Sequence, residues 1–228
     1  MRRVLVIAAH ADDEVLGVGG TIARHALEGD HVDVAFMTDG VGSRGCSSTD
    51  SEARTEAAHQ ALTILNARLV HWSSFPDNAM DTVSLLTITK VVEEIKMRSR
   101  PHVVYTHHDG DLNIDHVVTA RAVLTAFRPQ PQETYTEIRA FEVLSSTGWS
   151  TSAPFVPDTY IDITPTRDRL LAAYDAYALE QRPDPHARSR FALETKIAHR
   201  GREVGVPAAE AFRTIRRIVR STQQQEPT

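Results

Sequence analysis

Cysteine is almost absent from this sequence of 228 residues, in which Cys46 stands alone. An intrachain disulfide and a cysteine-rich zinc site are therefore both excluded. A basic excess is also lacking, because the formal net charge is −5 at pH 7. Without a basic field over the whole chain, we expect neither a nucleic acid nor an anionic membrane surface as a partner.

Long apolar runs are missing too. The opening Met-Arg-Arg-Val-Leu-Val-Ile is too short for a signal peptide or a membrane span, so we expect a cytoplasmic protein. No Gly-Lys-Ser/Thr sequence is present, which excludes a Walker-type phosphate loop, and residues 17–20 (Gly-Val-Gly-Gly) fall short of the dinucleotide fingerprint. These glycines lie in an expected helix, where they would permit close approach to a strand.

Composition and pattern predict one globular α/β domain over residues 1–228, with a frayed tail from about residue 221. Strand and helix patterns alternate along the chain, which favours a Rossmann-like, mostly parallel sheet with helices on both faces. The expected strands are 3–9, 31–38, 68–72, 102–106, 138–144 and 159–163. The expected helices are 15–28, 51–66, 81–98, 116–127, 164–177, 188–202 and 208–219.

The first expected strand runs directly into a histidine and three acids, His10-Ala11-Asp12-Asp13-Glu14. Open α/β sheets build their sites at the carboxyl ends of parallel strands. Consecutive carboxylates repel one another unless a cation lies among them, so this motif predicts a metal site. The alternative is an acidic first helical turn, which the helix dipole favours.

A second cluster of histidines and acids follows the strand expected at 102–106. It contains His107, His108, Asp111, Asp115 and His116. Because both clusters follow strands of the same parallel sheet, they should meet at one edge and complete a metal site that His10 and one aspartate could not form alone.

The two clusters together resemble the PIG-L/LmbE-like family of zinc-dependent de-N-acetylases. The family's Ala-His-Pro-Asp-Asp-Glu motif stands here as Ala-His-Ala-Asp-Asp-Glu over residues 9–14, and its His-x-Asp-His motif as Asn-Ile-Asp-His over residues 113–116. Shorter similarities follow at residues 54–56 (Arg-Thr-Glu) and 75–77 (Phe-Pro-Asp). The resemblance implies a hydrolase that removes acetyl from an N-acetylated amino sugar or sugar conjugate.

Carried over residue by residue, the resemblance implies a zinc ion held by His10, Asp13 and His116, and Asp12 as the base that takes a proton from water. Two imidazoles and one carboxylate leave a coordination position open, as in catalytic sites, and they also suit ferrous iron. Asp115 would orient a ligand imidazole through its second ring nitrogen, or cap the helix expected from residue 116, or do both.

Substrate contacts are implied for Arg54, Asp77 and Asn113, of which the first two could instead form surface ion pairs or caps. Asn113 stands where the family often has a histidine that protonates the leaving amine, and an amide cannot act as a general acid. Three alternatives follow: His107, His108 or Asp111 supplies that proton, Asp12 carries it, or the chain binds without catalysis.

Two other functions stay open beside deacetylation of a sugar. One is a metal-dependent amidase acting on another small N-acyl metabolite, and the other is a non-catalytic metal-binding or sugar-binding homologue. Family members often form trimers or hexamers, so we expect a homo-oligomer, with the apolar segment 149–155 as a possible contact. Four arginines (Arg213, Arg216, Arg217 and Arg220) would lie on the last expected helix, where cations suit the helix dipole.

Overall fold

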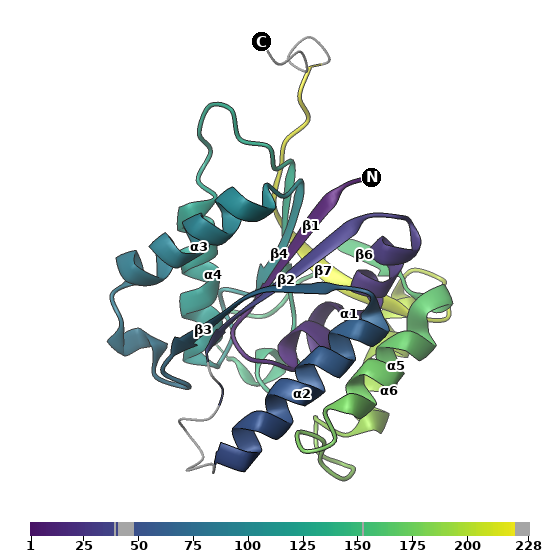
Figure 1. Cartoon of the computed structure of the whole chain (residues 1–228). Helices are drawn as coiled ribbons and strands as arrows, with labels where there is room; N and C mark the ends of the chain where they lie inside the picture. The colour runs from purple at the N-terminus through teal and green to yellow at the C-terminus, as the bar shows by residue number, and fades with distance from the viewer. Residues whose placement is uncertain (39, 41–47, 152, 222–228) are drawn as a thin grey trace.

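A seven-stranded sheet in the order β3-β2-β1-β4-β5-β7-β6 runs through the centre of the computed structural model (Figure 1). The structure describes residues 1–38, 40, 48–151 and 153–221. The strands are β1 (Arg3–Ala8), β2 (His31–Thr38), β3 (Arg68–Phe75), β4 (Val103–His107), β5 (Glu137–Phe141), β6 (Thr159–Asp162) and β7 (Ala209–Arg217). Strands β1 to β5 pair in parallel, and β7 runs against both of its neighbours. The predicted mostly parallel α/β sheet is confirmed.

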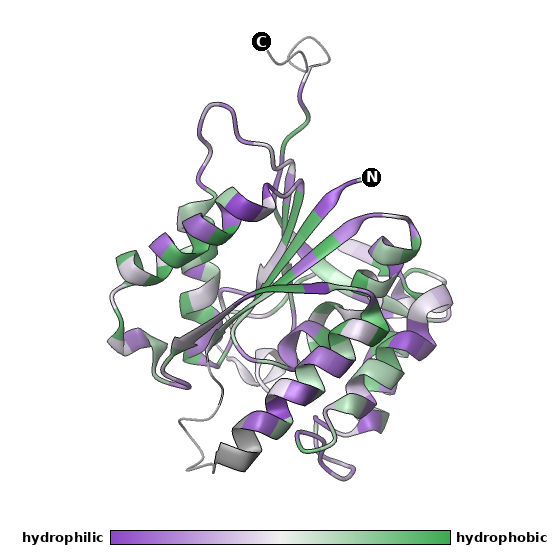
Figure 2. Cartoon of the chain, in the orientation of Figure 1, coloured by the Kyte–Doolittle hydropathy of each residue, from purple (hydrophilic) through white to green (hydrophobic). Residues whose placement is uncertain are grey.

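Helices cover both faces of this sheet (Figure 1). One face carries α1 (Asp13–Leu27), α2 (Ser48–Leu65), α5 (Arg167–Ala176) and α6 (Arg190–Glu203), and the other carries α3 (Leu85–Ser99) and α4 (Ile114–Ala126). Short 3-10 turns lie at Met80–Thr82, Thr147–Trp149 and Thr164–Thr166. Figure 2 shows the apolar residues gathered on the strands and on the helix sides that face them. No helix in the described part of the chain is long and apolar enough to cross a membrane.

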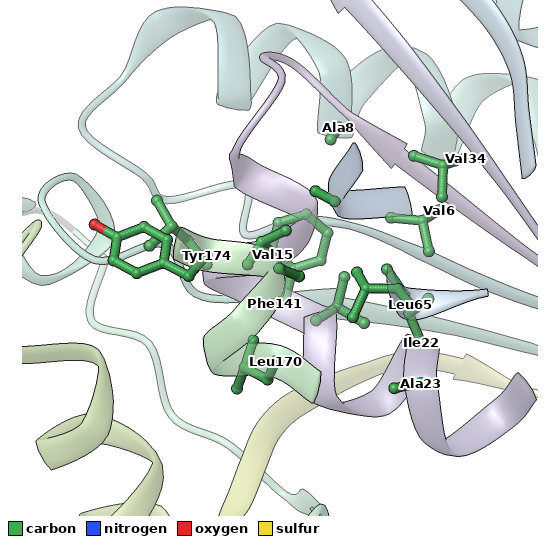
Figure 3. Close-up of a cluster of buried hydrophobic side chains, with 14 of the residues drawn as sticks. Val6, Ala8, Val15, Ile22, Ala23, Val34, Leu65, Phe141, Leu170 and Tyr174 are labelled. Atoms are coloured by element: carbon green, nitrogen blue, oxygen red, sulfur yellow. The ribbon is translucent and has the colours of Figure 1, made fainter. Parts of the chain in front are cut away.

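The larger of two hydrophobic cores lies between the sheet and helices α1, α2, α5 and α6. Figure 3 shows Val6 and Val34 from the strands packed near Ile22 of α1. Glycines of α1 allow this close packing, because a Cβ on Gly17 would overlap the ring of Phe141 and one on Gly20 would lie 2.6 Å from Ile163 Cδ1. The expected close approach to a strand is confirmed for Gly17, because Phe141 belongs to β5, whereas Ile163 follows the end of β6.

The strand order reverses between β1 and β4, since β2 and β3 lie on one side of β1 and β5 lies beyond β4. At such a reversal the connections leave in opposite directions, and a crevice opens at the carboxyl ends of the two strands. The first histidine-acid cluster follows β1, and the second begins at the end of β4. The fold therefore brings both clusters to this crevice.

The last expected helix, 208–219, is wrong: residues Ala209–Arg217 form strand β7. Alanine, glutamate and arginine are strong helix formers, but local propensity yields to tertiary context. Here β7 pairs along both edges, with β5 and with β6. The arginine cluster therefore begins on a strand, where Arg216 donates to the carbonyl of Phe127 at 2.8 Å.

Smaller differences concern the ends of helices and strands. The helix expected at 164–177 begins with the 3-10 turn Thr164–Thr166, and α5 follows it. A frayed tail is expected from about residue 221, and the residues after position 221 lie outside the described part of the chain. The glycine-rich sequence of residues 39–45 predicts a loop, and apart from Gly40 these residues also lie outside the described part of the chain.

Candidate functional site

Two imidazoles and a carboxylate meet where the turn between β1 and α1 faces the start of α4. Nδ1 of His10 lies 3.1 Å from Oδ2 of Asp13 and 3.3 Å from Nε2 of His116. Oδ2 of Asp13 and Nε2 of His116 are 3.2 Å apart. All three side chains are buried. Three potential ligand atoms thus form an almost equilateral triangle.

The second nitrogen of each ring faces a carboxylate. Nε2 of His10 lies 3.0 Å from Asp115 Oδ2 and 3.2 Å from Asp77 Oδ1, while Nδ1 of His116 lies 3.3 Å from Asp111 Oδ1. A carboxylate accepts a hydrogen bond from a protonated ring nitrogen, so in the neutral rings the nitrogens of the triangle are the ones that carry free lone pairs. Both rings are therefore oriented as metal ligands require.

Backbone groups hold Asp115 in this position. Its carboxylate accepts from the amide of Asn78 at 2.6 Å and from that of Met80 at 3.0 Å. The alternative in which Asp115 caps α4 is wrong, because the helix begins at Ile114 and Asn113 caps it by accepting from the Asp115 amide at 2.8 Å. The carboxylate of Asp115 is thereby left to face His10.

The electrostatics of the cluster favour positive charge in the triangle. Burial alone would lower the pKa of His10, but hydrogen bonds with Asp115, Asp13 and Asp77 raise it well above its usual value. Burial also opposes protonation of His116, yet Asp13 and Asp111 raise its pKa to about 9. Without a metal, the carboxylates favour protonation of the two imidazoles. A divalent cation bound at the triangle would supply that positive charge instead.

The triangle fits a tetrahedral metal. With metal–ligand bonds of about 2.0–2.1 Å, the corners of a tetrahedron lie about 3.3–3.4 Å apart. The observed separations of 3.1, 3.2 and 3.3 Å are close to that spacing. In addition, the buried Oδ1 of Asp13 has no hydrogen-bond partner among the described residues. The residues present therefore fit zinc or a similar divalent cation.

Asp12 lies beside the triangle, with its main chain in the left-handed region at φ 118°. Its amide donates to Glu14 Oε2 at 3.0 Å, and Glu14 in turn accepts from the hydroxyl of Tyr177 at 2.7 Å. Its Oδ2 accepts from Nη1 of Arg188 at 2.9 Å. Burial raises the pKa of Asp12 to about 6, against the opposing charge of Arg188.

A pocket of about 120 Å³ opens next to Asp12, and its lining is polar. Around it lie His10, Asp12, Arg54, Asp77, Asn78, Asn113 and Arg188. Arg54, Asp77 and Asn113, which are predicted to contact substrate, thus line one pocket together with Asp12 and His10. Arg54 also forms an ion pair with Glu180.

The neighbouring histidines turn toward the protein. Nε2 of His107 accepts from the amide of Ala9 at 2.8 Å, and its ring stacks on His116 with centroids 3.9 Å apart. Burial, together with the charge of His116, lowers the pKa of His107 well below its usual value. Nε2 of His108 lies 3.1 Å from the carbonyl oxygen of Ala153. Neither residue lies among those around the pocket.

Several residues of the site carry no signal in the sequence. Ser146 and Thr147 both donate to Oδ2 of Asp111. Arg188 and Glu180 come from the segment between α5 and α6, far along the chain from the motifs. They lie in loops without a recognisable pattern, so only the folded chain brings them together.

A family model described as PIG-L, GlcNAc-PI de-N-acetylase, matches residues 5–127. An uncharacterized deacetylase of Escherichia coli K12 is 33% identical over 135 residues, which cover 57% of this chain and 70% of that protein. A 1D-myo-inositol 2-acetamido-2-deoxy-alpha-D-glucopyranoside deacetylase of Rhodococcus jostii is 29% identical over 257 residues, covering 86% of this chain and 87% of that protein.

Solved structures share the fold. An N,N'-diacetylchitobiose deacetylase from Pyrococcus horikoshii superposes with a TM-score of 0.76 at 20% identity, covering 94% of this chain and 84% of that chain. A 4-carboxy-2-hydroxymuconate hydratase from Pseudomonas putida superposes with a TM-score of 0.77 at 23% identity, covering 97% and 99%. One fold therefore carries two chemistries, and the residues of the site rather than the fold decide the activity.

Proposed function

Because this chain belongs to the PIG-L family of GlcNAc-PI de-N-acetylases, we propose that it is a metal-dependent hydrolase acting on an N-acetylated amino sugar or sugar conjugate. The reaction consumes water and releases acetate and a free amine. The observation that carries the proposal is the triangle of His10, Asp13 and His116 with the carboxylate of Asp12 beside it.

His10, Asp13 and His116 would hold the metal. When bound there, zinc supplies a Lewis acid for the amide carbonyl and lowers the pKa of water. Three protein ligands leave room for water and substrate, as catalytic zinc sites do. Ferrous iron suits the same ligand set and is the alternative to zinc.

Asp12 would be the catalytic base, because it lines the pocket beside the triangle, whereas the other carboxylate of the pocket, that of Asp77, faces Nε2 of His10. It takes a proton from the attacking water as the oxygen of that water bonds to the acetyl carbon. Its neighbour Asp13 points to the imidazoles, so adjacent residues divide metal binding and proton transfer.

The proton must then reach the nitrogen as the carbon–nitrogen bond breaks. Asn113 cannot give it, and its side chain is engaged with the Asp115 amide and with Asn78 Oδ1. We propose that Asp12 returns the proton it took, which balances the reaction with one group. Donation by His107 or His108 stays a prediction, and it would require these buried rings to reach the substrate nitrogen.

The polar pocket suits a hydroxyl-rich substrate. Arg54 offers a fork of donors and Asp77 offers acceptors, which is the combination that neighbouring sugar hydroxyls need. Asn113 and Asn78 bring amide groups to the same pocket. We therefore propose that these residues orient the sugar ring while its acetamido group faces Asp12.

The test compares the wild type with Asp12→Asn. Bound metal and acetate release are measured against a panel of N-acetylglucosamine conjugates and of other small acetamides. The proposal predicts about one metal per chain in both proteins and a loss of acetate release of about 10²–10⁴-fold in the variant. Equal acetate release from both proteins would contradict the role of Asp12.

Asn113 favours a second candidate, a homologue that binds metal and sugar without hydrolysis, because the usual proton donor is replaced. Sugar that binds the metal-loaded protein but is never hydrolysed would support it. Release of acetate from acetamides that are not sugars would instead indicate an amidase for another small N-acyl metabolite. Assembly into a homo-oligomer also stays a proposal, and light scattering would test it.

A further inference from the structure

The carboxylate of Asp12 is held by an arginine from the C-terminal part of the chain. Nη1 of Arg188 donates to Asp12 Oδ2 at 2.9 Å and lies 3.4 Å from Glu180 Oε2, while its Nε donates to Ser145 Oγ at 2.9 Å. Arg188 lies outside residues 5–127, the part that matches the family model. The contact is therefore a feature of this chain that the motifs do not describe.

Asp12 needs such support because its main chain is unusual. A non-glycine residue at φ 118° persists only where the surroundings hold it. The amide of Asp12 is fixed by Glu14, which the hydroxyl of Tyr177 holds. Arg188 fixes the other end, the carboxylate. Both supports depend on residues that follow α4 in the sequence, Tyr177 and Arg188.

The guanidinium also connects the two halves of the site. Nε of Arg188 donates to Ser145. The next residue, Ser146, places its Oγ 3.4 Å from Nδ1 of His116. Arginine presents its donors in a rigid plane, so one side chain can fix Asp12 and Ser145 at a set separation. A lysine ammonium is a single point of charge and cannot span both.

We propose that Arg188 is a positioning residue for the proposed hydrolysis, in which it fixes Asp12 by one carboxylate oxygen and leaves the other for the attacking water. The inference rests on the proposed function. Arg188 is not an anion-binding group in this arrangement, because its charge already faces the carboxylates of Asp12 and Glu180. It transfers no proton, since a guanidinium stays charged in proteins.

Arg188→Ala tests the proposal, with Arg188→Lys as the charge-retaining variant and Arg190→Ala as the control. Arg190 lies two positions further on and pairs with Asp175 at a surface where its side chain is 41% exposed. We expect Arg188→Ala to lower kcat about a hundredfold with KM and bound metal near wild-type values. Guanidinium in the low millimolar range should restore much of kcat. Arg188→Lys should stay slow, and Arg190→Ala should match the wild type.

A wild-type kcat in Arg188→Ala would overturn the proposal. So would a loss of kcat that guanidinium does not relieve, because that result indicates a structural role. Relief by guanidinium is the readout that distinguishes positioning from scaffolding, since a small cation can replace the missing group but cannot refold a damaged loop.

A second readout does not depend on turnover. Guanidinium at the same concentration should raise the melting temperature of Arg188→Ala, but not of the wild type or of the double variant with Asp12→Asn. An equal rise in the melting temperature of the single and double variants would contradict the proposed contact between Arg188 and Asp12. If this pattern holds while the wild type releases no acetate from any amide, the proposed function fails and the Arg188–Asp12 contact stands.

Discussion

Replacing Asp111 by asparagine should weaken metal binding without unfolding the chain. Asp111 Oδ1 lies 3.3 Å from Nδ1 of His116, the nitrogen that faces away from the triangle. Its other oxygen accepts from Ser146 at 3.2 Å and from Thr147. The carboxylate thus fixes the ring tautomer that offers Nε2 to a metal.

The expected loss follows from the role of such a carboxylate. Removing the partner that orients a ligand histidine typically weakens metal affinity about 10–100-fold. This factor corresponds to about 1.4–2.7 kcal/mol in binding free energy. An alanine would leave Thr147, Ser146 and the Asn113 amide without their acceptor. Asparagine keeps an acceptor oxygen, so the effect on folding should be smaller.

The assay is a titration of metal-free protein with zinc in competition with a chelator of known affinity. The control is Asp109→Asn in the same loop, where the side chain is 52% exposed and 3.4 Å from His108. We expect the control to bind zinc as the wild type does. Unchanged affinity in Asp111→Asn, or equal weakening in both variants, would refute the reasoning about the His116 tautomer.

Three further predictions concern proton donation, packing and pH. If either histidine donates the proton, His107→Ala combined with His108→Ala lowers turnover far more than metal content, and full activity would remove both as donors. Gly17→Ala should lower the free energy of unfolding by about 1–2 kcal/mol, because overlap with a buried ring exceeds the gain in helix propensity. Gly148→Ala is the control and should change this free energy little, because an added Cβ there meets no atom of the described residues within 4 Å. Burial lowers the pKa of His25, so the folded state binds fewer protons than the unfolded state and its stability falls as the pH drops below 6.5. His25→Gln should flatten this pH dependence when the free energy of unfolding is measured in urea from pH 7 to 5. The same pH dependence in the wild type and the variant would contradict the prediction.

The sequence predicts the centre of the fold and the meeting of the two histidine-acid clusters, whereas the choice of His10, Asp13 and His116 as metal ligands comes from the resemblance to the family. The apolar residues of β1 are buried, and His10 lies two positions beyond the end of that strand. The second cluster follows β4, and parallel strands place their carboxyl ends at one edge. Local pattern and one topological rule are therefore enough to bring His10 and His116 together.

Strand β7 could not be predicted from local pattern. Residues 209–213 (Ala-Glu-Ala-Phe-Arg) favour a helix by propensity. In the fold Glu210 is buried and accepts from the amides of Gly20 and Thr21 in α1, at 2.9 and 2.7 Å. These contacts and the pairing with β5 and β6 depend on distant residues, which a local reading does not include.

The supports of the site escaped prediction for the same reason. Arg188 is separated from Asp12 by 176 positions. Ser146 and Asp111 are 35 positions apart. Neither Arg188 nor Ser146 belongs to a periodic pattern or a motif, and only the completed fold creates their contacts with the site.

We propose that a metal held by His10, Asp13 and His116 makes this chain a deacetylase. The most direct test is to remove metal with a chelator and to measure acetate release from an N-acetylglucosamine conjugate while zinc is added back. We predict no release from the metal-free protein and a rise that levels off at about one zinc per chain. Acetate release that is unaffected by the chelator would contradict the account.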